Sequence, residues 1–337
     1  MIVEGNYISD NISYSQLKIF DEEGAKGLLK PKNLDGKGIR FGSLLDDYLF
    51  LSKEDFTNKY EVVNTPLLAG DEYKLAVILK NQYSSFNELI KVHTNEKYKD
   101  SVIEIIKANK LFGRVSVRST FLSKFDNKEF YDFVKKLYED KILIHISDLV
   151  FAKNCKGELL SNKKTKHYFI NEHENIYQAN IQFEYRKQNV KCLLDMLIIN
   201  HKDKIITPID LKTGSPGIED FKQNFFNYKY YLQGAIYNKA AEEYNKKHFN
   251  GKYKIEEFKF LYLCRYDISN PLIYRMSSKW NKAGLEGFKT LGGWKYRGIN
   301  QLMDELLWHK ENKKFNHSRE IYENSEVYLD DSYIIVD

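Results

Sequence analysis

Residues 191–214 read KCLLDMLIINHKDKIITPIDLKTG, two apolar runs separated by a short polar turn. The first run contains one charge, Asp195, and the second contains two, Asp210 and Lys212, which share one face of a strand because they are two residues apart. The polar residues 200–204 predict a hairpin turn. If paired residue numbers sum to 405 across that turn, Asp195 lies opposite Asp210, with Cβ atoms roughly 5 Å apart.

Two carboxylates at that spacing repel each other by about 4 kcal/mol at an effective dielectric constant near 20. A fold that places them together usually needs a shared proton or a divalent cation. Lys212 supplies only one charge, but it is suited to holding a water or a developing oxyanion beside a metal. The alternative is a solvent-facing Asp/Lys pair that contributes a fraction of a kcal/mol. The spacing alone leaves both interpretations open.

A longer pattern surrounds these residues. Asp195 is followed by DLKTG, from Asp210 to Gly214, and then by Gln233 and Tyr237, four residues apart on a predicted helix. The combination resembles the PD-(D/E)XK nuclease superfamily, in particular its RecB-like and RecE-like exonucleases, including phage enzymes. The resemblance implies an α/β fold, a restriction-endonuclease-like core with a central mixed β-sheet flanked by helices, plus an N-terminal helical subdomain.

The resemblance also implies roles for individual residues. Asp195, Asp210 and the Leu211 backbone carbonyl would hold one or two Mg²⁺ or Mn²⁺ ions, and Lys212 would position the attacking water. Gln233 and Tyr237 would face the same site from the helix and complete the catalytic set.

A further acidic residue is predicted on the first core helix, within residues 36–50, GKGIRFGSLLDDYLF. Family members have a G-[ST]-x-x-[HD] pattern there, and its last position, a metal-proximal His or acid, is Asp46 in this chain. The neighbouring Asp47 would point about 100° away around the helix. Without the resemblance, both residues are simply acids near a helix N-terminus, where the helix dipole favours them.

Residues 213–232 alternate aromatic residues with lysines after the metal-binding strand. Such a segment suits stacking on exposed bases and contact with phosphates. The alternative is that half of the aromatic side chains form the buried face of a helix, as we expect for Phe225 and Leu232. The predicted DNA contacts are Thr213, Ser215, Lys222, Tyr230 and Tyr231.

Further strands are predicted on both sides of this motif. Before it, the segments HYFI, IYQANIQFEYR and VKCLLDMLII predict three strands. Relatives place a Glu near the position of Asn180, whereas this chain offers Gln178, Asn180, Gln182 and Glu184. Whether Glu184 or Asn180 contributes to the metal site stays open. After the motif, residues 255–276 predict two strands joined by a turn at Asn270 and Pro271.

We therefore expect three regions. Residues 1–160 form an N-terminal helical region that includes the first core helix at about 36–50. Residues 161–300 form the nuclease core, and residues 301–337 form a C-terminal helix and tail. His309 lies in a segment that resembles the end of phage family members, and we expect it to be structural.

The composition fits an intracellular globular protein. Of 337 residues, 29% are charged and 42% are apolar, and the net charge of +5 is compatible with nucleic acid. The three cysteines lack CxxC spacing, which indicates a reducing compartment and disfavours a zinc or iron–sulfur site. Neither a leader nor a membrane-spanning run is predicted. We expect a cytoplasmic protein of a bacterium or phage-infected host cell, without a membrane partner.

The resemblance predicts a Mg²⁺-dependent DNA exonuclease that degrades linear DNA from its ends in phage-type recombination, replication or repair. A single-strand-annealing or single-strand-binding protein would be its partner. Two other functions stay open, a structure-specific or restriction-like endonuclease on the same fold and a non-catalytic DNA-binding module.

Overall fold

The computed structural model describes residues 11–29, 37–64, 67–68, 70–93, 98–113, 119, 128–139, 141–169, 173–214 and 218–324. Contacts within the chain define two compact units. The sheet unit comprises residues 1–46 and 157–337, and the helical unit comprises residues 47–156. The chain leaves the sheet unit within α2 (Lys37–Phe50) and returns to it within α9 (Ile146–Ser161).

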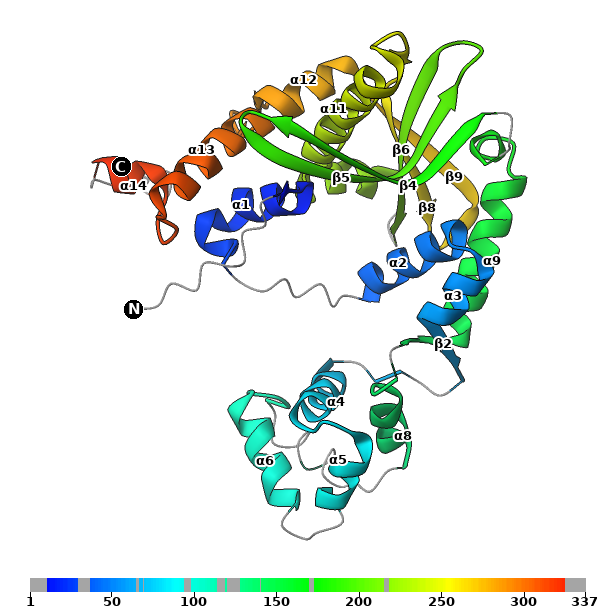
Figure 1. Ribbon diagram of the computed structural model, residues 1–337, viewed down its shortest axis with the longest axis vertical. Helices are drawn as coiled ribbons and strands as arrows, with labels where there is room; N and C mark the ends of the chain where they lie inside the picture. The colour runs from blue at the N-terminus through cyan, green and yellow to red at the C-terminus, as the bar shows by residue number, and fades with distance from the viewer. Residues whose placement is uncertain are drawn as a thin grey trace, which may run out of the picture. The chain divides into compact units, whose positions relative to one another are not determined.

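A mixed β-sheet forms the centre of the sheet unit (Figure 1). In the described residues its order is β1-β5-β6-β8-β9, with β4 also paired to β5 and β7 to β6. Pairing is antiparallel for β4–β5, β5–β6 and β8–β9, and parallel for β1–β5, β6–β7 and β6–β8. The predicted α/β class with a central mixed sheet flanked by helices is confirmed. The strands are β1 (Asn11–Ile12), β4 (Glu174–Tyr185), β5 (Gln188–Asn200), β6 (Ile205–Gly214), β7 (Lys254–Ile255), β8 (Phe258–Cys264) and β9 (Asp267–Met276).

The predicted hairpin of β5 and β6 is present. β5 ends at Asn200 and β6 begins at Ile205, and the pairs run from Asn200 with Ile205 to Met196 with Ile209, all summing to 405. Both strands are buried along most of this stretch. A slip of one residue would move every side chain to the other face, because side chains alternate along a strand. The register predicted from the sequence is confirmed over these pairs.

Helices cover the sheet in the same unit. The longest, α11, contacts β4, β5, β6, β7 and β8. A Cβ at Gly234 in α11 would lie 2.3 Å from Sδ of Met276 and 3.2 Å from the ring of Phe258, so a larger residue would force the Met276 side chain to move. The helices are α1 (Tyr14–Gly27), the first part of α2, the end of α9, η1 (Lys166–Tyr168), α10 (Ile218–Asn227), α11 (Tyr230–Phe249), α12 (Ser278–Glu286), α13 (Ile299–Asn312) and α14 (Arg319–Asn324). A small hairpin pairs β10 (Phe288–Lys289) with β11 (Lys295–Tyr296).

Both ends of the described chain pack on this sheet unit. α1 begins with a capping box between Ser13 and Gln16 and contacts α11 and α13. The unit is therefore discontinuous in sequence, unlike the three successive regions that we expected. His309 in α13 is 1% exposed, and its Nδ1 pairs with the carbonyl of Lys314, in agreement with a structural role.

The helical unit has its own core. Side chains from α4, α5, α6 and α8 pack together there, and the N–H of Phe112 donates to Oδ2 of Asp71 at 2.8 Å. A two-stranded parallel sheet that the sequence did not predict joins β2 to β3. The elements are α3 (Lys53–Lys59), β2 (Tyr60–Val63), α4 (Gly70–Gln82), α5 (Phe86–His93), α6 (Tyr98–Ala108), α8 (Lys128–Lys136), β3 (Ile142–His145) and most of α9.

Two local predictions are wrong. The predicted strand HYFI overlaps the 3₁₀ helix η1, whose Tyr168 is buried with the ammonium of Lys259 5.6 Å from its ring centroid. The turn between the last two strands lies at residues 265–266, so Asn270 and Pro271 fall inside β9. Proline is tolerated there because β9 is an edge strand with a register irregularity.

Candidate active site

The carboxylate of Asp195 turns toward the backbone of the next strand. Regular β5–β6 pairing ends at Met196 and Ile209, one rung before this residue. Oδ2 of Asp195 accepts the N–H of Leu211 at 2.7 Å, and Oδ1 accepts the side-chain amide of Gln178 at 3.3 Å. Asp195 is therefore fixed by hydrogen bonds where the hairpin ladder stops.

The β4–β5 pair is also irregular at this rung. Gln178 lies opposite Asp195 but has a positive φ of 49°, and the ladder omits this pair while remaining in register on both sides. Before Asp195, the β5 side chain that packs in the main core is Leu194, and after Asp195 it is Leu197. Because these residues are three apart rather than two, β5 turns a different face toward the core on either side of Asp195. Backbone strain of this kind concentrates at functional sites, because the surrounding structure must hold it.

Asp210 and Lys212 lie on one face of β6, as the spacing predicted. Their side chains form an ion pair, and Nε2 of Gln233 in α11 donates to Oδ1 of Asp210 at 2.7 Å. The ammonium of Lys212 lies 5.2 Å from the ring centroid of Tyr230. Helix α11 thus fixes the second carboxylate, while the lysine is held between a carboxylate and an aromatic face.

Burial dominates the titration of these groups. Burial, followed by the charge of Asp210, raises the pKa of Asp195 to about 7, although Lys212 and two hydrogen bonds oppose the rise. Burial also raises the pKa of Asp210 against the opposing effects of Lys212 and Gln233. For Lys212, burial by itself would lower the pKa, but nearby acids and Tyr230 outweigh it and hold the pKa well above its ordinary value.

The balance of charges and donors fits a bound cation. Two carboxylates, the half-buried Asp195 and the buried Asp210, face the half-buried ammonium of Lys212, which leaves one negative charge or a retained proton. Oε1 of Gln233 is buried without a hydrogen-bond partner among the described residues. Carboxylate and carbonyl oxygens are the ligands that Mg²⁺ prefers.

Asp46 is the residue whose predicted role the geometry leaves untested. No three His, Cys, Asp or Glu side chains in the described ranges lie together to hold an ion, so Asp46 is not grouped with Asp195 and Asp210. The carboxylate of the neighbouring Asp47 accepts bonds from Lys59 at 2.6 Å and Tyr60 at 2.5 Å. Asp47 therefore has a structural role inside the helical unit.

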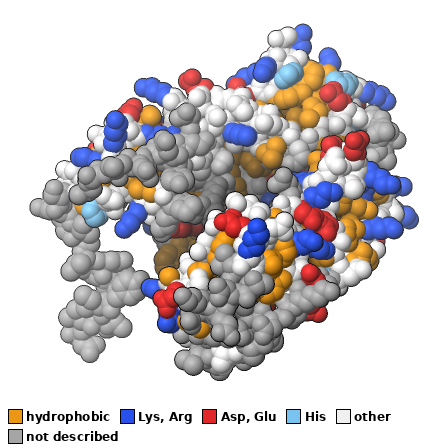
Figure 2. Space-filling model, turned by 60° about the horizontal axis from the view of Figure 1, so that its bottom comes forward, with side chains coloured by type: hydrophobic (Ala, Val, Ile, Leu, Met, Phe, Trp, Pro, Cys, Tyr) orange, Lys and Arg blue, Asp and Glu red, His pale blue; other side chains and the backbone are white. Residues whose placement is uncertain are grey.

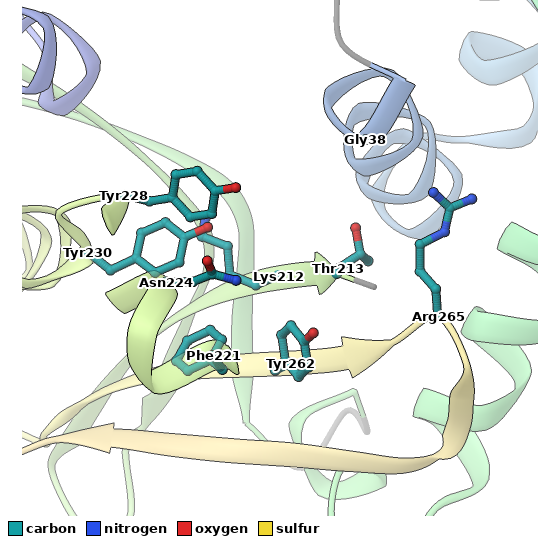
Figure 3. A pocket seen from close by; sticks show the side chains of 10 residues that line it. Gly38, Lys212, Thr213, Phe221, Asn224, Tyr228, Tyr230, Tyr262 and Arg265 are labelled. Atoms are coloured by element: carbon teal, nitrogen blue, oxygen red, sulfur yellow. The ribbon is translucent and has the colours of Figure 1, made fainter. Parts of the chain in front are cut away.

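A pocket of about 320 Å³ opens beside Lys212 (Figure 3). Of the predicted DNA contacts, Thr213 and Tyr230 line it. Ser215 lies outside the described residues. The remaining lining residues are Gly38, Gly214, Phe221, Asn224, Tyr228, Tyr262 and Arg265.

Other predicted contacts lie elsewhere. Tyr231 is fully buried and packs edge-on against Phe288 at 5.2 Å, so the prediction that it stacks on DNA is wrong. Phe221 is also buried and stacks on Tyr274 at 4.0 Å, as expected for the inner face of a helix. Lys222 is exposed but lines a separate, largely apolar cavity beneath α10.

Tyr237 lies one helical turn beyond Gln233. It is 9% exposed, and its ring meets that of Phe258 edge-on at 6.0 Å. Burial and then the charge of Asp210 raise its pKa. Gln233 contacts the carboxylate directly, whereas Tyr237 supports the same face of α11.

Sequence reasoning assigned no role to two residues of the site, Gln178 and Tyr14. Gln178 could have been found, because the turn of the preceding hairpin at Arg186 and Lys187 makes paired numbers sum to 373 and sets Gln178 opposite Asp195. Asn180 and Glu184, the positions left open, are exposed on β4. No comparable sequence pattern points to Tyr14, the second residue.

Tyr14 reaches the site from the start of α1, where its hydroxyl donates to the carbonyl of Tyr228. Burial raises the pKa of Tyr14, and the charge of Lys212 partly opposes that rise.

Among the described residues on the face in Figure 2, Lys and Arg side chains are mixed with Asp and Glu. No helix within the described ranges is both long and apolar enough to cross a bilayer. The three cysteines are free thiols.

Comparison with known proteins finds similarity among solved structures. No protein-family model and no curated protein sequence matches the chain. A solved structure similar to it is the "Putative exonuclease" from Eubacterium rectale, with a TM-score of 0.45 and 11% sequence identity over 98% of this chain and 95% of that one. Likeness at this level does not assign an activity.

Proposed function

We propose that this chain is a metal-dependent deoxyribonuclease of the PD-(D/E)XK type that hydrolyses phosphodiester bonds from DNA ends. One observation carries the proposal. The buried carboxylate of Asp210 and the half-buried side chains of Asp195 and Lys212 meet on adjacent strands with an excess negative charge, and the pKa of Asp195 is about 7. A structural ion pair does not require more carboxylates than cations, whereas a site that binds a divalent cation and a phosphate requires this excess of negative charge.

The residues that would hold Mg²⁺ or Mn²⁺ are Asp195, Asp210 and the Leu211 carbonyl, and the family resemblance adds Asp46 as a ligand. A bound ion would lower the pKa of a water and neutralise phosphate oxygens. Lys212 keeps its proton because of Asp210, so its ammonium can orient the attacking water and stabilise charge that develops on the phosphate. Gln233 and the Leu211 N–H hold the two carboxylates in place.

The end requirement and the biological role are supported by the family resemblance. A role in phage-type recombination, replication or repair, with a single-strand-annealing or single-strand-binding partner, rests on that resemblance alone.

The test is to incubate equal amounts of linear and covalently closed circular plasmid with the protein and Mg²⁺, with parallel reactions in EDTA. We expect the linear form to disappear and the circle to persist. Comparable loss of the circle would establish the endonuclease alternative. Retention of both forms, together with tight DNA binding, would establish a non-catalytic module.

A further inference from the structure

The pocket beside Lys212 has the chemistry of a nucleotide site. Aromatic side chains form much of its wall, Asn224 supplies an amide, and no carboxylate belongs to the part of its lining that the structure describes. The cations Lys212 and Arg265 lie at different ends of that lining (Figure 3). A ligand that fits has a flat ring with a polar edge and negative charge on both sides of it.

The strand register sets the spacing of the backbone positions that carry those cations. Gly214 lies two residues beyond Lys212 on β6, and its carbonyl accepts the N–H of Arg265 at 2.8 Å. Two residues of strand span about 7 Å. Arg265 therefore follows Lys212 along one direction of the sheet, as a second phosphate follows the first along a strand of DNA.

We propose that this pocket binds one unpaired nucleotide next to the scissile phosphate, with its base against Tyr228 and Tyr230 and its outer phosphate at Arg265. The proposal rests on the nuclease function above and adds a substrate class, DNA whose reacting nucleotide is single-stranded. A volume of about 320 Å³ is at the lower end of small-ligand pockets and accommodates one nucleotide rather than a base pair.

The two tyrosines are held in place by the backbone between them. Lys229 has a left-handed φ of 55°, an uncommon conformation outside glycine, and it directs its own ammonium to Asp21 in α1. Tyr14 donates to the carbonyl of Tyr228, and the Lys18 ammonium lies 5.0 Å from the ring centroid of Tyr228. Strain that the surroundings hold in this way preorganises a binding site.

The experiment pairs a protein change with a substrate change. Tyr228 is 45% exposed, so Tyr228→Ala should fold normally. The substrates are a single-stranded 20-mer of thymidylate and the same strand with three abasic residues at each end. We expect Tyr228→Ala to lower kcat/KM about 10-fold on the ordinary strand, within the range of one base–aromatic stack. On the abasic strand it should have little effect, because the base is already missing.

Trp294→Ala is the matched control, since Trp294 is 74% exposed and lies outside the pocket. This variant should have the wild-type kcat/KM on both substrates. An equal loss on both strands with Tyr228→Ala would overturn the nucleotide pocket.

For the outer phosphate, Arg265→Gln should reduce the slope of the logarithm of the binding constant against the logarithm of the salt concentration by about 0.7, as for one lost phosphate contact on a single strand. An unchanged slope would remove Arg265 from the proposal.

A binding arm separates failure of this inference from failure of the nuclease function. Dissociation constants for the same strands are measured in EDTA by fluorescence anisotropy. If wild-type protein with Mg²⁺ degrades neither these strands nor linear plasmid, the nuclease function is wrong. If it degrades linear plasmid but neither strand, the single-stranded substrate class is wrong and the nuclease function stands. The pocket then stands only if Tyr228→Ala weakens binding of the ordinary strand and not of the abasic strand, and equal weakening refutes it.

Discussion

Two clusters of charged side chains in the sheet unit differ in their balance. In the Asp21 cluster, Asp21 pairs with Lys229 and with Arg297 at 2.7 Å, and Arg297 also pairs with Glu305 at 2.8 Å. Two carboxylates thus meet two cations. In the candidate active site, two carboxylates meet only Lys212 among the described residues.

The difference separates a structural cluster from a functional one. Balanced partners hold each other, and breaking such a set leaves an uncompensated buried charge. An unbalanced set is costly in the free protein and is retained where a ligand supplies the missing charge. The two clusters are also linked, because Lys229 of the Asp21 cluster lies between the pocket residues Tyr228 and Tyr230.

The largest expected effect is from Asp210→Asn. Hydrolysis should fall at least about 10³-fold, since the metal contributes several kcal/mol of transition-state stabilisation. Affinity for DNA in EDTA should be spared, and the metal-free melting temperature should hold or rise because a repulsion is relieved. Rates with Mg²⁺ and thermal melts in EDTA measure both. Full activity in this variant would remove Asp210 from the site.

Lys212→Met should separate chemistry from metal binding. Turnover should fall by roughly 10²-fold, as on losing one preorganised charge-stabilising donor. Mg²⁺ affinity measured by calorimetry should persist or increase, because a positive charge near the ion has gone. Concurrent loss of metal binding would point to a structural role for Lys212.

Asp21→Asn should act in the opposite sense on stability. The side chain of Asp21 is 7% exposed, and its loss leaves Lys229 and Arg297 short of a partner. We expect the free energy of unfolding to drop by about 2–4 kcal/mol in denaturant titrations. Destabilisation by Asp210→Asn to the same extent would erase the contrast between the two clusters.

The pH dependence of the metal-free protein should reveal the unbalanced cluster. The pKa of Asp195 is about 7 in the folded chain, against an ordinary value of 3.8, so the folded state binds more protons between these values. Stability therefore falls as pH rises through this window and levels off above it. Melting temperatures in EDTA between pH 5 and 8 should decline for wild type and less for Asp195→Asn. Parallel curves would contradict the raised pKa.

The smallest effect is expected at Asp47. Asp47→Ala should leave Mg²⁺ affinity nearly unchanged because Lys59 and Tyr60 already engage that carboxylate, whereas Asp46→Ala should weaken the affinity or remove a second ion. Calorimetric titration compares the two. The reverse result would mean that the metal-facing side of α2 is rotated by one residue, about 100°.

Much of the site could be predicted because strand periodicity is local. The two apolar runs and the polar turn between them determine the β5–β6 register, and the two-residue spacing determines that Asp210 and Lys212 share a face. The spacing of the capping residues likewise predicts the start of α1. These features depend on neighbours in sequence.

Burial and strain were decided by the tertiary structure. An aromatic side chain in a lysine-rich segment reads the same in sequence whether it faces solvent or the core, and only the packing of α11 on β10 and β11 buries Tyr231. The left-handed backbone of Lys229 and the irregular rung at Gln178 follow from contacts with distant segments, Asp21 and Asp195. Local sequence propensity does not predict these backbone conformations, because long-range contacts stabilise them against their local energetic cost.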